Sequence, residues 1–199
     1  MPRESTMHPI YEKLLELAAP YLNTRLNDVH TREVLRVAEP LLQEIDARED
    51  VVVPALILHD VGWKMVPEDL QLKAFGPRPF DASLQRIHEV EGARLAREIL
   101  DLVDYDRTKA DQIVQIVEGH DSRAEALSIE DMVVKDCDKL TRFRQAAFDM
   151  VRERFEYPAA EYVIWLEQHI DRWFFTETAG RLAREELEKR RGEVTLDPR

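Results

Sequence analysis

Cysteine and long apolar runs are scarce in this chain. Its 199 residues include one cysteine, Cys137, which excludes an intramolecular disulfide and any cluster of thiolate ligands. No apolar stretch approaches the roughly 20 residues that cross a bilayer, and the N-terminus has no basic segment followed by an apolar one. We therefore expect a cytoplasmic protein that contacts no membrane and whose metal ligands, where it has any, are nitrogen and oxygen atoms.

Positive charge is also in short supply. The chain has 28 Lys and Arg residues against 40 Asp and Glu residues, a formal net charge of -12. Such a surface repels duplex nucleic acid unless its basic side chains are locally concentrated. We expect no duplex nucleic acid partner, whereas a small anion bound in a metal-bearing cleft remains compatible with this charge.

Glycine is rare, at six residues, and the apolar residues recur mostly with helical spacing. The sequence therefore predicts an all-α protein with helices joined by short turns. Asn23, Thr24 and Asn27 are candidate caps for the second helix. The segment 62–81 carries Pro67, Gly76, Pro77 and Pro79 and is expected to form a loop or lid with one helical turn. Helices are expected at about 8–19, 27–46, a stretch ending near 59–60, 82–102, 106–119 and 128–155.

The segment Val51–Leu58 resembles a strand by residue type. Pro54 is unfavourable inside a sheet, however, and is easily accommodated in the first turn of a helix. We therefore predict a buried helix that ends near His59 and Asp60.

Four of the six histidines recur at intervals of about 30 residues, at His30, His59, His88 and His120, and His169 follows farther along the chain. His30, His88 and His120 each share a helical stripe with apolar residues three, four or seven positions away, so all three should point inward. One inward histidine is more often a hydrogen-bonded core residue than a ligand. Three of them on different helices, together with an Asp-rich segment, can be satisfied jointly by a cation.

The order of these residues resembles the HD-domain superfamily of metal-dependent phosphohydrolases. The similarity spans about residues 25–145, and the ordered set is far more specific than any single member. The matching segments are NDVHTREVLRVA around His30, ALILHDVGWK around His59 and Asp60, RIHEVEGARLAREIL around His88, IVQIVEGHDS around His120, and VVKDCDKL.

The resemblance implies one HD-type helical bundle over 1–199, with a metal-binding core at about 25–145 and a helical extension at about 146–192. Tyr162, Trp165 and Trp173 make that extension rich in aromatic residues. We expect it to form an added layer of helices or a self-association surface, such as that of a homodimer.

The resemblance also implies a ligand set for one or two divalent ions. Asp136 stays open as an alternative ligand to Asp138 or as its hydrogen-bonding neighbour. Asp60 would bridge two ions, and Mn2+, Mg2+, Fe2+, Co2+, Ni2+ and Zn2+ all fit imidazole with carboxylate. The implied ligands are His30, His59, Asp60, His88, His120 and Asp138.

The implied reaction is hydrolysis of a small phosphorylated substrate, with a nucleotide-like ester favoured. A bound divalent ion lowers the pKa of its water to roughly 7, and Asp60, Asp121 or a metal-bound water would act as the acid. Lys64 and Arg123 are the preferred phosphate-binding cations because each lies within five residues of an implied ligand. Two alternatives stay open: a di-iron oxygenase with the same ligand set, and a non-catalytic domain that senses a nucleotide or scaffolds a partner.

Overall fold

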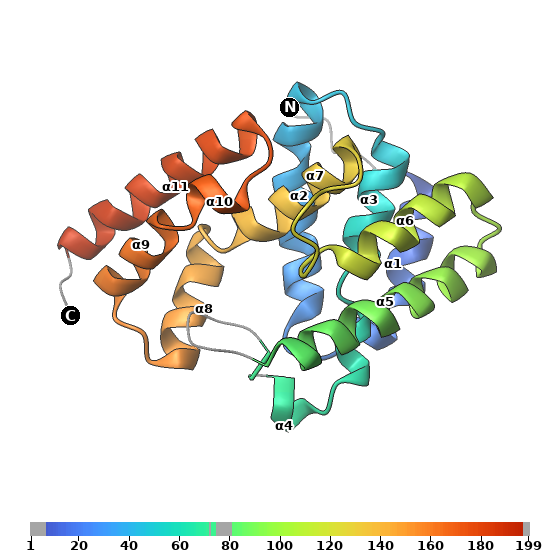
Figure 1. The fold of residues 1–199 in the computed structure, drawn as a ribbon, viewed down its shortest axis with the longest axis horizontal. Helices are drawn as coiled ribbons and strands as arrows, with labels where there is room; N and C mark the ends of the chain where they lie inside the picture. The colour runs from blue at the N-terminus through green and yellow to red at the C-terminus, as the bar shows by residue number, and fades with distance from the viewer. Residues whose placement is uncertain (1–6, 72, 75–80, 197–199) are drawn as a thin grey trace.

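The computed structural model describes residues 7–71, 73–74 and 81–196. These residues form helices joined by turns and contain no strand (Figure 1). This confirms the predicted all-α class. The elements are α1 (Pro9–Leu22), α2 (Asn27–Glu44), α3 (Glu49–Leu58), the 3-10 helix η1 (Val61–Met65), α4 (Glu68–Gln71), α5 (Ala82–Leu102), α6 (Arg107–Gly119), α7 (Ile129–Thr141), α8 (Gln145–Phe155), α9 (Ala159–Glu167), α10 (Ile170–Trp173) and α11 (Glu177–Leu196).

Helix α3 lies at the centre of the N-terminal part and contacts α1, α2, α6 and α7. All of its residues from Val51 to Leu58 are buried, which explains a helix that is apolar on every side. Helices α8 to α11 extend the bundle to one side, at the left of Figure 1, and α11 packs on α2, α7 and α9. None of the described helices is long and apolar enough to span a membrane.

The prediction of Pro54 in a first helical turn was wrong. Helix α3 begins at Glu49, so Pro54 lies inside it. Proline has no backbone N–H, which leaves the carbonyl of Asp50 without its helical donor. The hydroxyl of Tyr105 donates to this oxygen at 2.6 Å and satisfies it.

The expected side-chain caps of α2 were also wrong. Its N-cap is Leu26, which has φ 65° and makes no side-chain cap. The amide of Asn27 donates instead to the carbonyl of Asp60 at 3.3 Å, and the hydroxyl of Thr24 to Gln71 Oε1 at 3.2 Å. These polar side chains hold the start of α2 against the segment that follows α3.

The predicted helix at 128–155 is interrupted, because α7 ends at Thr141 and α8 begins at Gln145. No proline or glycine marks the break. Phe143 lies in the break, is fully buried, and contacts the rings of Trp173 and Phe174. Burial of this side chain accounts for a break that local propensity does not predict.

The segment predicted as a loop or lid contains η1 and the short α4 in its described part. Trp63, Val66, Ala74 and Leu84 form a small apolar cluster there, apart from the main core. Gly76, Pro77 and Pro79 lie outside the described residues.

Candidate metal centre

Gly62 sets the position of the His59-Asp60 pair at the end of α3. A Cβ atom at Gly62 would lie 1.9 Å from the carbonyl oxygen of His88 and 2.4 Å from the backbone nitrogen of Gly92. Only glycine allows η1 to approach the backbone of α5 so closely. At Gly92 itself a Cβ would make ordinary contacts, at 3.4 Å or more. The close approach brings His59 and Asp60 next to His88.

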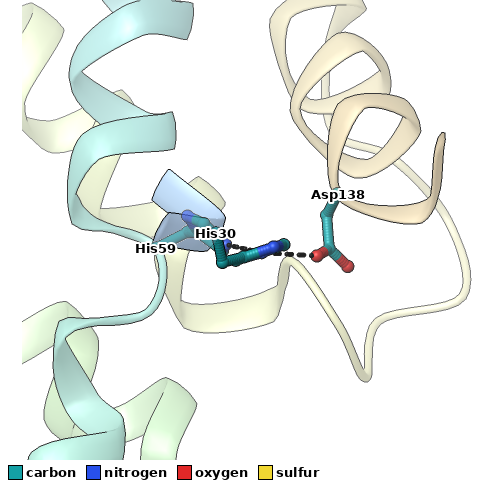
Figure 2. A group of neighbouring side chains, drawn as sticks. All are labelled: His30, His59 and Asp138. Carbon is teal, nitrogen blue, oxygen red and sulfur yellow. Dashed lines mark hydrogen bonds and ion pairs between the residues drawn. The ribbon is translucent and has the colours of Figure 1, made fainter. Parts of the chain in front are cut away.

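Three side chains from α2, the end of α3 and α7 form a first donor group (Figure 2). His30 Nε2 lies 3.2 Å from His59 Nε2 and 3.2 Å from Asp138 Oδ1. Asp60 Oδ2 lies 3.7 Å from His30 Nε2 and 3.6 Å from His59 Nε2. Two imidazole nitrogens and two carboxylates therefore converge on one point.

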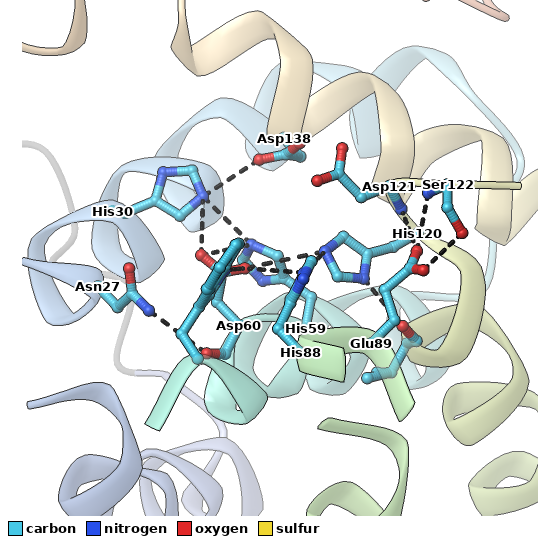
Figure 3. Close-up of polar contacts among 12 residues, drawn as sticks. Asn27, His30, His59, Asp60, His88, Glu89, His120, Asp121, Ser122 and Asp138 are labelled. Atoms are coloured by element: carbon cyan, nitrogen blue, oxygen red, sulfur yellow. Dashed lines mark hydrogen bonds and ion pairs between the residues drawn. The ribbon is translucent and has the colours of Figure 1, made fainter. Parts of the chain in front are cut away.

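A second donor group lies on the other side of Asp60 (Figure 3). It consists of His88, His120 and Asp121, each of which can offer one ligand atom within a common 4.8 Å. The Nε2 atoms of His88 and His120 are 3.4 Å apart, and Asp60 Oδ1 lies 4.0 and 3.8 Å from them. Asp60 therefore points one oxygen atom at each donor group.

Backbone carbonyls orient two of the imidazole rings. His59 Nδ1 lies 2.8 Å from Leu56 O, and His120 Nδ1 lies 2.9 Å from Val117 O. A carbonyl is only an acceptor, so Nδ1 carries the proton in both neutral rings, and Nε2 presents its lone pair to the donor groups. This is the usual way in which a protein fixes the tautomer of a metal-binding histidine.

The protonation states also suit metal binding. Burial lowers the pKa of His59, and burial together with His120 lowers the pKa of His88 to about 4. Burial alone would raise the pKa of Asp60, but the neighbouring imidazoles lower it to about 2. Neutral imidazole and ionised carboxylate are the forms that coordinate cations. In His30, burial lowers the pKa, but the hydrogen bond to Asp138 and the charges of Asp60 and Asp138 together outweigh burial and raise it.

The spacing of the donors fits a shared cation. Two donors that each lie about 2.1 Å from one ion are separated by about 3.0 to 3.4 Å. The separations between His30 and His59, between His30 and Asp138, and between His88 and His120 are 3.2, 3.2 and 3.4 Å. Converging imidazole lone pairs repel each other unless a cation lies between them, so the donor set fits one or two divalent ions.

Trp63 is a site residue that the sequence did not single out. Its indole N–H donates to Asp60 Oδ1 at 3.0 Å, and its ring stacks on His88 with centroids 4.0 Å apart. The guanidinium of Arg25 covers the indole ring at 3.8 Å from the ring centroid. Trp63 therefore orients the central carboxylate and one imidazole together. Its position three residues after Asp60 was the available signal.

Glu89 was also missed, although it directly follows His88. It is fully buried and accepts hydrogen bonds from the backbone N–H groups of Asp121 and Ser122 at 2.9 and 2.8 Å, and from the Ser122 hydroxyl at 2.5 Å. Burial raises its pKa, but the hydrogen bonds from Ser122 outweigh burial and lower it. Glu89 thus holds the turn that carries His120 and Asp121.

Lys139 contacts one aspartate of each donor group. Its Nζ contacts Asp121 Oδ1 and lies 2.9 Å from Asp138 Oδ2. Burial raises the pKa of Asp121, but Lys139, Arg142 and His120 together outweigh burial and lower it well below its usual range. An ionised Asp121 has no proton to donate, so it is better suited to be a ligand than a general acid.

The two preferred phosphate-binding cations lie away from the donor groups. Lys64 is exposed and donates to the carbonyl of Asn23 at 3.4 Å. Arg123 donates to Asp131 at 2.9 Å and to the carbonyl of Gln115 at 3.1 Å. The cations that do lie beside the donors are Lys139 and Arg142, one and four residues after Asp138 in the sequence.

Asp136 points away from the donor groups. Its oxygen atoms accept from the backbone N–H groups of Phe175 and Thr176 at 2.8 and 3.0 Å, and from the Thr176 hydroxyl at 2.6 Å. Of the two aspartates that the sequence left open, Asp138 is the one beside His30.

Comparison with known proteins agrees with this architecture. The HD domain model matches residues 27–142. A protein from an uncultured Thermotogales bacterium, described as a predicted HD superfamily hydrolase, has a similar fold, with a TM-score of 0.64 and 19% identity over 92% of this chain and 88% of that one. No protein with a curated description matches. Because the HD domain match covers more than half of the sequence and includes every one of the donor residues, the chain belongs to the HD domain family.

Proposed function

We propose that this protein is a metal-dependent hydrolase that cleaves a small phosphoester. One observation carries the proposal: Asp60 directs its two oxygen atoms to two separate pairs of imidazoles. A carboxylate between two such donor groups is suited to bridge two divalent ions. Paired ions about 3.5 to 4 Å apart are characteristic of phosphatases and nucleases.

His30, His59, Asp60 and Asp138 would hold the first ion, and His88, His120, Asp121 and Asp60 the second. When bound, such ions polarise a phosphoryl oxygen and lower the pKa of a coordinated water to about 7, which supplies a nucleophile at neutral pH.

The protein contributes orientation and charge. Trp63 and the carbonyls of Leu56 and Val117 hold the central carboxylate and two imidazoles, so little reorganisation is needed during the reaction. Lys139 adds a positive charge beside Asp121 and Asp138. We propose no general acid among these carboxylates, because the pKa values of both Asp60 and Asp121 lie below their usual range and both groups would hold an ion.

The proposal extends to partners as well. We propose that the substrate is a small phosphorylated molecule, with nucleotides among the candidates. We also propose that the protein is cytoplasmic, that it binds no duplex nucleic acid, and that it self-associates through the helical extension.

The test compares the metal content of wild type, Asp60→Asn and the matched control Asp28→Asn. Asp28 lies on α2 beside Arg32 and is about half exposed. Protein purified without added metal should carry one to two transition-metal equivalents, and Asp60→Asn should lose most of them. Its phosphate release from a panel of esters should fall at least about 100-fold. Asp28→Asn should match wild type in both measurements.

Each other result has a defined meaning. Bound iron with O2 consumption and no phosphate release would replace the hydrolase by the di-iron oxygenase. Bound metal with neither activity would favour the non-catalytic sensing or scaffold domain. Absence of metal even after reconstitution would contradict the proposal altogether.

A further inference from the structure

A chamber of about 330 Å3 opens directly beside the donor groups. His30, Asp60 and Asp138 form part of its floor. Its far wall comes from α8 and α9, so the C-terminal extension completes the surroundings of the site. The inference drawn below rests on the proposed phosphoester hydrolysis and concerns the substrate of that same site.

The wall of the chamber is largely apolar. Leu26 and Val29 lie at its edge and remain 58% and 49% exposed, which is unusual for large apolar side chains. The apolar and aromatic side chains that line it beyond the floor include Val29, Ala147, Met150, Val151, Tyr162 and Trp165.

Most polar side chains of the lining already have partners within the protein. The Asn27 amide donates to the Asp60 carbonyl at 3.3 Å, and the Thr141 hydroxyl to the Asp138 carbonyl at 2.7 Å. Glu33 accepts from Arg36 and Arg144. A nucleobase is recognised by hydrogen bonds to its edges, and this lining offers few free groups for them.

Two of the three arginines are the exception in this lining. Arg25, Arg142 and Arg154 all face the chamber, although acidic residues outnumber basic ones in the chain. The side chains of Arg142 and Arg154 make no hydrogen bond or ion pair with any residue in the described part of the chain. Guanidinium groups gathered at one chamber repel each other, and an anion relieves that repulsion.

The backbone at Arg25 and Leu26, on the opposite wall of the chamber, is held in an unusual conformation. Arg25 and Leu26 have φ values of 53° and 65°, in the left-handed region that costs roughly 1 kcal/mol or more for a residue with a side chain. Two adjacent non-glycine residues in this region mark a segment that the surrounding structure holds in place. This conformation presents Arg25 over Trp63 and Leu26 at the rim.

Arg142 is the arginine best placed to meet a phosphoryl group. It follows α7 directly, four residues after Asp138, and the charges nearest to it are those of Asp138 and Asp121. Its guanidinium lies 5.3 Å from the ring centroid of Trp173 and keeps its N–H donors unused among the described residues. The planar N–H donors of a guanidinium beside a site for divalent ions are suited to bind a phosphate oxygen.

We propose that the substrate is a phosphomonoester of a predominantly apolar alcohol: Arg142 binds a phosphoryl oxygen, Arg154 adds positive potential along the chamber, and the apolar group lies against α8 and α9.

The first test measures binding without turnover. Mn2+-loaded protein is titrated by calorimetry with hexylphosphonate and with methylphosphonate, which share the anionic group and differ only in the chain. Burial of the longer chain should strengthen binding at least about tenfold. Equal affinity for the two phosphonates, or binding of neither, would overturn the proposal.

Two variants separate the charge from the wall. Arg142→Met should weaken binding of both phosphonates at least about tenfold, whereas Arg94→Met, an exposed arginine on α5 paired with Glu91 and Glu98, should change neither. Ala147→Leu should weaken hexylphosphonate alone, and Ala160→Leu, exposed on α9, should weaken neither. A misfolded variant would lose both ligands, so selective loss of the longer one is a specific outcome.

A turnover assay distinguishes this inference from the proposed function. Hexyl phosphate and glycerol 1-phosphate are both esters of primary alcohols, so a higher kcat/KM for hexyl phosphate reports the chamber rather than the leaving group. Hydrolysis without this preference, or with AMP preferred, would overturn the apolar assignment and leave the hydrolase intact. Selective phosphonate binding without hydrolysis of any ester would remove the hydrolase and leave the chamber assignment standing.

Discussion

Asp136 and Asp138 lie two residues apart on α7 and face opposite sides of it. Residues at i and i+2 do not share a helix face. Asp138 meets His30 at 3.2 Å, whereas Asp136 accepts three hydrogen bonds at the start of α11. One aspartate is therefore assigned to the metal site and the other to the attachment of the C-terminal helices.

Because Asp136 and Asp138 have different roles, substitution of each should affect a different property, stability for Asp136 and metal binding for Asp138. Asp136→Ala removes a buried carboxylate that accepts three partly buried hydrogen bonds from Phe175 and Thr176, and should lower the free energy of unfolding by about 2 to 3 kcal/mol, with metal still bound by the folded protein. Asp138→Ala should lose metal with a smaller effect on metal-free stability. Urea denaturation and metal content check both. Metal loss in Asp136→Ala with unchanged stability would make Asp136 the ligand instead.

At the scale of residues, the sequence named the histidine and aspartate side chains that the structure gathers around Asp60 but not Trp63, which donates to it. Their coordination of metal stays a prediction. Histidine and aspartate in a fixed order are a strong signal. The phosphate-binding roles of Lys64 and Arg123 stay predictions, although their side chains are hydrogen-bonded to Asn23 and Asp131. Closeness in sequence to a ligand does not fix where a side chain points, because Lys64 lies in the 3-10 helix η1 and Arg123 in the non-helical segment after α6.

At the scale of elements, the close contact between η1 and α5 sets the geometry of the site. Gly62→Ala would drive a Cβ atom into the carbonyl of His88, and a backbone atom cannot move aside as a flexible side chain can. We expect the free energy of unfolding to fall by about 3 kcal/mol or more and metal content to fall with it.

Gly192→Ala is the matched control for this prediction. Gly192 lies in α11, where a Cβ would meet nothing, so alanine should be neutral or should stabilise the helix by up to about 1 kcal/mol. Urea denaturation of both variants makes the comparison. If Gly62→Ala unfolds like wild type and keeps its metal, the close contact is not what positions His59 and Asp60.

Elements with local signals were predicted well. Helix α5 has the predicted bounds. The N-caps of α6 and α7 are Asp106 and Ser128, whose side chains accept from Lys109 N and Asp131 N. The break after α7 was missed because it depends on where Phe143 is buried. The sequence around it remains favourable to helix, so only tertiary packing reveals the turn.

At the scale of the whole molecule, one apolar core connects the metal-binding part with the extension. It runs from Tyr11 in α1 to Leu187 in α11 without interruption among the described residues, and it includes Phe143 at the junction. We therefore expect the single domain over 1–199 that the sequence predicts to unfold as one cooperative unit.

The three tryptophans allow this to be measured. Trp63 lies at the donor groups, whereas Trp165 and Trp173 lie in α9 and α10. Both variants are studied without metal. In Trp63→Phe, the remaining tryptophan fluorescence comes from the extension. In the double variant Trp165→Phe, Trp173→Phe, it comes from the site. Within each variant, urea transitions followed by fluorescence and by far-UV circular dichroism should coincide, as for a two-state domain. If the extension instead unfolds at lower urea than the site, the chamber wall formed by α8 and α9 can detach while the donor groups persist, and the protein comprises two units rather than one.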